Sequence, residues 1–174
     1  MSEAICRELE CTRDGSGCDN KLTHAARSRL RLELQGLAFA ISRGATPEEY
    51  ARFLWGSGAV RWMGCHAPGV DEYLLKEMDS MSRLFPWIKA VQADISPDEG
   101  EVVFAQGCLG GWGENRFALA RSLGLNRSAV CRYCAEACLV WGAQLGLKVE
   151  PKPGLGCKGG CCLTAKKAVT ALAR

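Results

Sequence analysis

The sequence contains no long hydrophobic run. In its first part the longest uncharged apolar stretch covers residues 36–41, whereas a membrane-spanning helix needs about 20 predominantly apolar residues. The first ten residues have neither a basic start nor an apolar stretch of signal-peptide length. We therefore expect a cytoplasmic protein with no membrane partner.

The sequence also has little excess of charge of either sign. The chain has 22 lysine and arginine residues against 19 aspartate and glutamate residues, a formal net charge of +3. Nucleic-acid binding relies on many basic contacts with phosphates, and so small an excess does not supply them. We expect no nucleic-acid partner. Only two histidines are present, and of these His66 is the one expected to reach a site in the folded part.

Several catalytic and nucleotide-binding motifs are missing. The sequence has no Gly-x-Ser-x-Gly nucleophile segment, no phosphate-binding loop and no dinucleotide fingerprint. Cysteine, in contrast, is abundant, with 11 residues in 174. In a reducing cytoplasm, thiols in such number are interpreted as metal ligands, reactive groups or small buried side chains rather than as a disulfide framework.

The domain organisation predicted from the sequence is a single domain with an N-terminal tail. Residues 1–21 hold Cys6, Cys11 and Cys18 among charged residues and glycines, with few apolar side chains that could pack. Residues 22–174 are long enough for one hydrophobic core. We expect a flexible tail over 1–21 and one ligand-binding domain over 22–174.

Helices are predicted in the first half of the chain. Residues 23–42 and 70–85 carry apolar side chains at three- and four-residue spacing, which is typical of amphipathic helices. Residues 46–49, Thr-Pro-Glu-Glu, supply an N-cap, a first-turn proline and a capping-box acid. A further helix is therefore expected to begin there and to extend towards residue 62.

The sequence of the second half of the chain predicts two hairpins separated by two helices. Asn126 or Ser128 caps the longer helix, and Gly146 closes it. Clusters of proline and glycine join the strands of each hairpin. The predicted elements are strands around the 97–100 turn, helices at 116–123 and from about 127 to 145, and strands at 147–150 and 161–164. The order predicts an α+β fold with N-terminal helices and an antiparallel sheet.

Three cysteines share one face of the predicted helix. Cys131, Cys134 and Cys138 are spaced by three and four residues. They are either small buried side chains of a core-facing stripe or ligands of a site. Seven helical residues rise about 10.5 Å, whereas sulfurs bound to one zinc lie within about 4 Å of each other. Cys131 and Cys138 therefore cannot share one zinc ion on an unbroken helix.

The glycine-rich segment that follows offers further thiols. Cys157, Cys161 and Cys162 lie close together in sequence, and with a helical pair they could complete a four-thiolate site for zinc or an iron–sulfur cluster. Neighbouring residues of a strand point to opposite faces of a sheet. If the segment is extended, only one of Cys161 and Cys162 can face the same ligand.

A second group of residues is expected to line a cofactor or ligand pocket. Cys108 and Trp112 lie in a glycine-rich turn, where the backbone can approach a ligand closely, and Cys138 continues the helical face. The same turn could equally be an ordinary connection. Cys65 and His66 could form a nucleophile and its base, although adjacent residues seldom face each other well.

Residues 102–166 carry a recognisable succession of features: a strand, Cys108 after it, a helix that begins with Val130-Cys131-Arg132-Tyr133-Cys134, a strand at 147–150 and the closing Gly159-Gly160-Cys161-Cys162. This part resembles the C-terminal part of proteins similar to L-2-amino-thiazoline-4-carboxylic acid hydrolase, relatives of the 4-vinyl reductase small-molecule-binding domains. The resemblance implies an α+β ligand-binding domain that can form a homodimer.

Three functional hypotheses follow. The first is a cysteine-rich binding domain that holds a metal, an iron–sulfur cluster or a small soft ligand. The second, from the resemblance, is a cysteine-dependent hydrolase of a small sulfur-containing ring compound. The third is a structural or assembly partner, in which the thiols are inert. An acid or base close to Cys108 or Cys131 would favour the hydrolase, and the sequence shows none.

Overall fold

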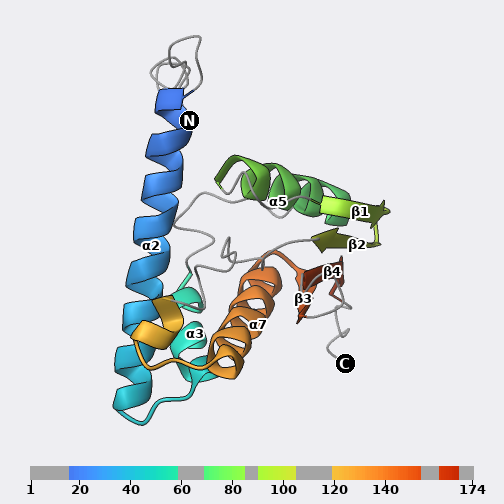
Figure 1. The fold of residues 1–174 in the computed structure, drawn as a ribbon. Coiled ribbons are helices and arrows are strands. Elements are labelled where there is room, and N and C mark those ends of the chain that lie inside the picture. The colour runs from blue at the N-terminus through green and yellow to red at the C-terminus, as the bar shows by residue number, and fades with distance from the viewer. Residues whose placement is uncertain (1–15, 59–68, 85–89, 105–118, 154–160, 169–174) are drawn as a thin grey trace, which may run out of the picture.

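The computed structural model describes residues 16–58, 69–84, 90–104, 119–153 and 161–168. Helices and strands are segregated along the chain, so the fold is α+β as predicted (Figure 1). The elements are α2 (Ser16–Ser42), α3 (Pro47–Trp55), α5 (Val70–Leu84), β1 (Ala90–Ile95), β2 (Glu99–Phe104), α7 (Arg127–Gln144), β3 (Leu147–Pro153) and β4 (Cys161–Lys167).

The four strands form one antiparallel sheet in the order β1-β2-β4-β3. The pairs β1–β2 and β3–β4 are the two predicted hairpins. They join through β2 and β4, whose register places Val102 opposite Leu163 and Phe104 opposite Cys161. Strands from the two hairpins are therefore neighbours at the centre of the sheet, which no local sequence pattern specified.

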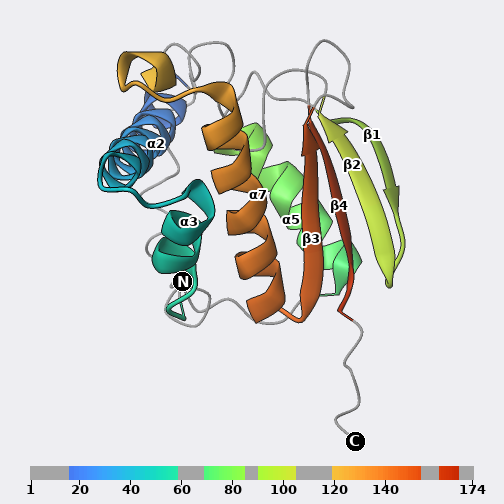
Figure 2. The ribbon, with the colours of Figure 1, turned by 90° about the horizontal axis from the view of Figure 1, so that it is seen from below.

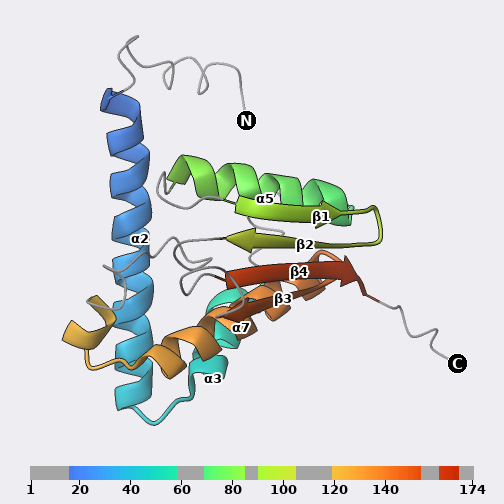
Figure 3. The ribbon, with the colours of Figure 1, turned by 45° about the vertical axis from the view of Figure 1, so that its right-hand side comes forward.

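The helices lie on one side of the sheet and beside it. In Figure 2, α5 passes behind β3 and β4, α7 runs beside β3, and α3 and α2 lie beyond α7. Figure 3 shows α2 as a long helix that crosses the ends of the other elements. None of the helices in the described ranges covers the second face of the sheet.

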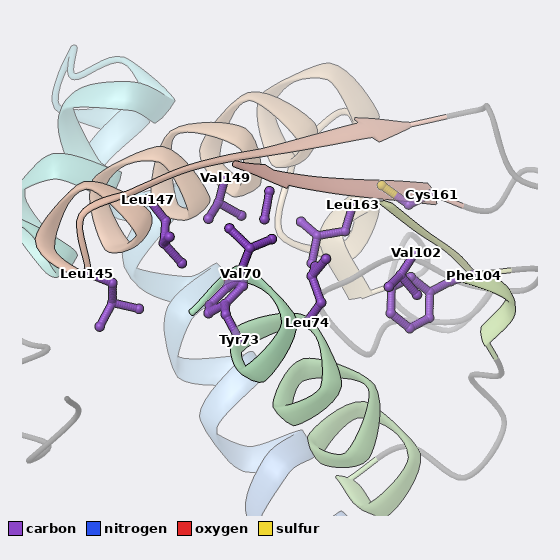
Figure 4. Packing of buried hydrophobic residues seen from close by; sticks show 11 residues of the cluster. Val70, Tyr73, Leu74, Val102, Phe104, Leu145, Leu147, Val149, Cys161 and Leu163 are labelled. Carbon is purple, nitrogen blue, oxygen red and sulfur yellow. The ribbon is translucent and has the colours of Figure 1, made fainter. Parts of the chain in front are cut away.

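One hydrophobic core fills the space between α5 and the sheet. Val70 and Leu74 of α5 are fully buried, and Figure 4 shows their side chains directed toward the strands. Cys138 and Trp141 of α7 pack against this core from the side. The buried members are Val70, Tyr73, Leu74, Val102, Phe104, Leu145, Leu147, Val149, Cys161, Leu163 and Ala165.

A second core lies between α2, α3 and α7. Leu34 and Leu37 of α2 are fully buried in it. From α7, Val130 and Tyr133 are buried in the same cluster. Leu30 packs against both cores, so α2 and α7 connect the sheet side of the molecule with the helical side.

Helix ends confirm the predicted caps. Thr46 accepts a hydrogen bond from the Glu49 backbone N–H at 3.2 Å, and its own N–H donates to the Glu49 carboxylate at 2.7 Å, which together form the capping box. Of the two proposed caps of α7, Asn126 is the one used. Gly146 follows with φ of +74°, the left-handed conformation that glycine adopts without strain.

Some predicted boundaries were wrong. Helix α2 begins at Ser16, earlier than the predicted start of this helix at residue 23. Helix α3 ends at Trp55 rather than extending towards residue 62, and Gly56 donates its N–H to the Arg52 carbonyl at the end of the helix. Of the predicted helix at 116–123, the structure describes helical residues at 119–122.

No helix in the described parts of the chain is long and apolar enough to cross a membrane.

Candidate functional site

Helix α7 places its cysteines between the two cores. Cys131, Cys134 and Cys138 are all partly exposed, whereas Val130, Tyr133 and Gly142 are the buried residues of this helix. Cys138 also packs against the first core, so at least this thiol takes part in the core-facing stripe, one of the two expected roles.

The thiols of α7 approach a tyrosine on α5. Tyr73 is buried in the first core, and burial raises the pKa of its phenol well above the ordinary value. The Glu77 carboxylate adds to this increase, and so do the nearby thiols of Cys138 and Cys134. The phenol of α5 therefore lies within electrostatic range of two sulfurs of α7, and Cys138 packs against the same core. We call this region the junction.

Glu77 is the acid of this junction. It lies one helical turn beyond Tyr73 and accepts a hydrogen bond from the phenol. Burial raises the pKa of the Glu77 carboxyl, while the Tyr73 hydrogen bond and the charge of Arg29 oppose the increase. A raised pKa is one of the features of carboxyls that take part in proton transfer.

A second polar network lies next to the first and shares Arg29. The Arg29 Nε donates to Glu33 at 2.8 Å. The Tyr133 hydroxyl donates to the other Glu33 oxygen at 3.1 Å and accepts from the Trp55 indole N–H at 3.0 Å. Burial is the main cause that raises the pKa of Tyr133. This chain of bonds joins α2, α3 and α7.

Two tryptophans border these networks. The rings of Trp55 and Trp141 meet edge to face with centroids 5.6 Å apart, and the Arg29 guanidinium lies 5.1 Å from the Trp55 centroid. The Gln144 side-chain amide donates to the Trp55 carbonyl at 2.6 Å. Edge-to-face aromatic pairs add to packing, and the polar groups beside them have fixed partners.

The strand cysteines face opposite sides of the sheet, as expected. Cys161 is buried in the core, and Figure 4 shows it at the end of the core where Phe104 and Val102 lie. Cys162 is also buried, but it does not belong to that core. Burial, together with the Glu101 carboxylate, raises the pKa of Cys162 to about 11. Its thiol is therefore protonated and unreactive near neutral pH.

The predicted metal set is not brought together by the described residues. Among them, no group of three or more histidine, cysteine, aspartate or glutamate side chains could hold a metal ion. Cys131, Cys134, Cys161 and Cys162 form no disulfide. The remaining predicted site residues, Cys157, Cys108 and Trp112, lie outside the described ranges, as do Cys65 and His66.

Sequence reasoning missed the residues opposite the helical thiols. Tyr73 and Glu77 fall within the predicted helix 70–85, at positions of its apolar stripe together with Val70 and Leu74. An acidic residue on an apolar stripe is a signal of a buried carboxyl, because charged side chains are seldom buried without a partner. No sequence signal indicates that Arg29 of α2 lies close enough to Glu77 to influence its pKa.

The chain was also compared with known proteins. No family model, no curated protein and no solved structure matches it. The resemblance of residues 102–166 to the hydrolase-like proteins therefore stays a prediction.

Proposed function

We propose that this protein is a cytoplasmic binding domain that holds a small soft ligand against the α7 thiols of Cys134 and Cys138. One observation carries the proposal: Cys138 packs against the core that contains Tyr73, within electrostatic range of its phenol. Partly exposed sulfurs, a buried phenol and a carboxyl with a raised pKa form a mixed polar and apolar site. Such a combination favours ligand binding over inert packing.

The soft ligand is a thiophilic metal ion, an iron–sulfur cluster or a sulfur-containing small molecule. Thiolates select soft metals, and zinc or a cluster is held by four protein ligands in a closed site. Cys134 and Cys138 would supply two of these ligands. Cys157 is the proposed source of a third, because it precedes β4 in the glycine-rich segment.

Two single substitutions test the site. The wild type is purified without oxygen and its zinc, iron and visible absorption are measured, together with those of Cys134→Ser and Cys138→Ser. We expect bound metal in the wild type and its loss from both variants, because serine is a poor ligand for soft metals. Cys11→Ser, in the N-terminal segment, is the matched control and keeps the metal.

The same experiment can contradict the metal form of the proposal. A wild type that is free of metal after anaerobic purification, and that takes up neither added zinc nor iron with sulfide, excludes zinc and the cluster. Binding should also weaken as the pH falls, because the thiolate ligands become protonated. Metal content that does not change between pH 8 and pH 5, values chosen to span thiol-ligand protonation, argues against thiolate ligation.

Cysteine-dependent hydrolysis is the second candidate, and one observation favours it. A hydrolase of this kind needs an acid or base near its cysteine. The sequence shows none next to Cys108 or Cys131, but Tyr73 and Glu77 lie at the junction with Cys138. Cys138 would act as the nucleophile that displaces the ring sulfur, and Glu77, through its raised pKa, as the acid that protonates this leaving group. Water would then cleave the bond to Cys138, which releases the product and restores the thiol. Ring opening of a 2-amino-thiazoline carboxylate that is lost in both Cys138→Ser and Glu77→Gln would support it. Turnover that survives in Cys138→Ser would exclude it.

A further inference from the structure

The side of α2 that faces away from the two cores carries two large apolar side chains. Leu32 is 69% exposed and Phe39 is 62% exposed, and neither packs in the two cores described above. About two helical turns separate them, so they lie on the same side of the helix. The other exposed residues of the stretch 28–43 are Ser28, Arg29, Arg31, Gln35, Ser42 and Arg43. We call this set, with Leu32 and Phe39, the outer face of α2.

The charge of the outer face is positive. It carries three arginines and no carboxylate, because Glu33, the acid of this stretch, is largely buried and accepts a hydrogen bond from Arg29 at 2.8 Å. Within the described part of the chain, Arg31 and Arg43 form no ion pair. The Arg43 guanidinium lies 5.2 Å from the centroid of the Phe39 ring. Basic groups therefore lie beside the exposed apolar side chains.

Helix α2 lies along one edge of the molecule. Figure 1 shows α5, α7 and the sheet on one side of this helix, and Figure 3 shows the same arrangement from another direction. The inner side of α2 supplies Leu34 and Leu37 to the second core. The outer face can therefore meet an extended flat surface that the sheet does not obstruct.

We propose that the outer face of α2 binds a membrane surface that contains anionic lipids. A helix of this kind lies parallel to the membrane, with its apolar side chains inserted at the level of the headgroups and its basic side chains beside the lipid anions. Leu32 and Phe39 are the inserting side chains, and Arg31 and Arg43 bind the headgroups. The cytoplasmic leaflet contains such lipids, which agrees with the expected cytoplasmic location.

This proposal revises one expectation from the sequence. The lack of a long apolar run was the reason to expect no membrane partner, but that argument concerns only helices that span the bilayer. A helix that lies on the surface needs apolar side chains on one face and basic side chains beside them. The outer face of α2 has both.

Two other classes of partner fit the outer face less well. A protein groove that binds a helix needs apolar anchors at successive turns, whereas Gln35 lies between Leu32 and Phe39 on this face. Nucleic acid is bound mainly through its phosphates, which would leave the two apolar side chains without a partner. An anionic membrane accommodates both kinds of side chain.

Binding through so small a surface is reversible. A single myristoyl chain gives only marginal membrane binding, and stable anchoring takes two such signals. Two inserted side chains and a few arginines do not exceed this level. Because the arginines act through their charge, binding is expected to weaken as salt is added.

The membrane surface is independent of the proposed ligand site. Cys134 and Cys138 belong to α7, and the outer face contains no cysteine. Cys134→Ser is therefore expected to bind vesicles as the wild type does, even where it loses the ligand.

Cosedimentation of the full chain with lipid vesicles at low ionic strength tests the proposal. The wild type should bind vesicles of phosphatidylcholine mixed with phosphatidylserine, and bind phosphatidylcholine alone much more weakly. Leu32→Gln with Phe39→Gln should weaken binding at least about tenfold, because the inserted apolar area is lost. Arg31→Glu with Arg43→Glu should weaken it at least about twentyfold, since each basic residue near an anionic surface contributes roughly a factor of five.

Each variant has a matched control elsewhere in the molecule. Leu75→Gln with Val91→Thr removes exposed apolar side chains from α5 and β1, and should bind like the wild type. Lys152→Glu with Lys166→Glu changes the net charge as much as the arginine variant does, at exposed positions of the sheet. This control should bind anionic vesicles much more tightly than the arginine variant. Circular dichroism establishes that every variant is folded.

Three results would overturn the proposal. The first is a folded wild type that does not bind vesicles containing phosphatidylserine. The second is an equal loss of binding in the arginine variant and in its lysine control, which would show a general effect of net charge. The third is binding that Leu32→Gln with Phe39→Gln retains in full, or a preference for duplex DNA over vesicles, because a partner recognised by charge alone would then explain the outer face.

Discussion

Glu77 shows how one residue can depart from the pattern around it. It occupies a position of the α5 stripe that Val70, Tyr73 and Leu74 fill with buried side chains. The Tyr73 phenol donates to its carboxylate and Arg29 lies near it, yet burial dominates and raises its pKa. Glu77 is partly exposed at the border of the core, and carboxyls with a raised pKa occur more often at functional sites than elsewhere.

The pH dependence of stability tests the burial of Glu77. Its pKa in the folded protein is raised above the ordinary value of 4.5, so the folded state holds this proton more tightly than the unfolded state. The wild type therefore loses stability, relative to Glu77→Gln, as the pH rises from about 4.5 through the raised pKa. Urea unfolding of both proteins across this range measures the difference.

Glu48→Gln is a control with the opposite sign. The hydrogen bond from Arg132 lowers the pKa of Glu48, so the wild type gains stability relative to this variant as the pH rises through the ordinary carboxyl range. The stability of the wild type relative to Glu77→Gln should fall as the pH rises. If this difference is constant with pH, or increases with pH as it does for Glu48→Gln, the Glu77 carboxyl is not buried.

At the scale of elements, α7 is the helix on which both the fold and the site depend. Arg132 binds Glu48 of α3 at 2.6 Å, and Arg52 of α3 binds Glu136 at 2.6 Å, so ion pairs in both directions align the two helices. On its other side α7 approaches β3 at Gly142. These contacts fix the rotation of α7 and hence the direction of its thiols.

Gly142 is a position at which α7 packs closely against β3. A Cβ atom at this position would lie 2.6 Å from the Val149 Cγ2 atom and 3.0 Å from the Leu147 carbonyl oxygen. Gly142→Ala is therefore expected to destabilise the protein by about 1–3 kcal/mol, because β3 must move away. Ala143→Ser, at the exposed neighbouring position, should change stability by less than about 0.5 kcal/mol.

Chemical denaturation of these two variants and the wild type gives both values. Equal stability of Gly142→Ala and the wild type would show that α7 does not need this contact, and would remove the argument that it holds the thiols toward Tyr73.

At the scale of the whole molecule, α2 joins the two cores. Leu30 packs against both of them, and Arg29 connects to both polar networks. Toward its beginning at Ser16, α2 extends beyond the body of the molecule (Figure 1). Among the described residues, the fully buried side chains of α2 are Leu34 and Leu37.

Truncation tests this description and the predicted N-terminal tail. A chain that begins at Ser16 is expected to unfold at the same temperature as the full chain, because the buried contacts of α2 start further on. A chain that begins after Leu30 loses Arg29 and the shared core residue, and should unfold at a lower temperature. Thermal unfolding followed by circular dichroism compares them. A large loss in the first truncation would show that residues 1–15 contribute to folding.

Features that depend on a few neighbouring residues could be determined from the sequence. The capping box at Thr46, the Asn126 cap and the turn at Gly146 follow from hydrogen bonds and backbone angles within one helical turn. The turn between β1 and β2 follows from local proline and glycine, and the order of the predicted elements indicated the α+β class. The alternation of strand residues also predicted that Cys161 and Cys162 face opposite sides of the sheet.

Only the tertiary structure decided which elements became neighbours. The pairing of β2 with β4, the approach of Tyr73 to the α7 thiols and the contribution of Arg29 to Glu77 all join residues far apart in sequence. Periodicity shows that a helix has an apolar face, but not which other element covers that face. The hydrophobic effect is nondirectional, so several different apolar surfaces could bury it equally well. The site therefore depends on packing, whereas the elements that carry it depend on local chemistry.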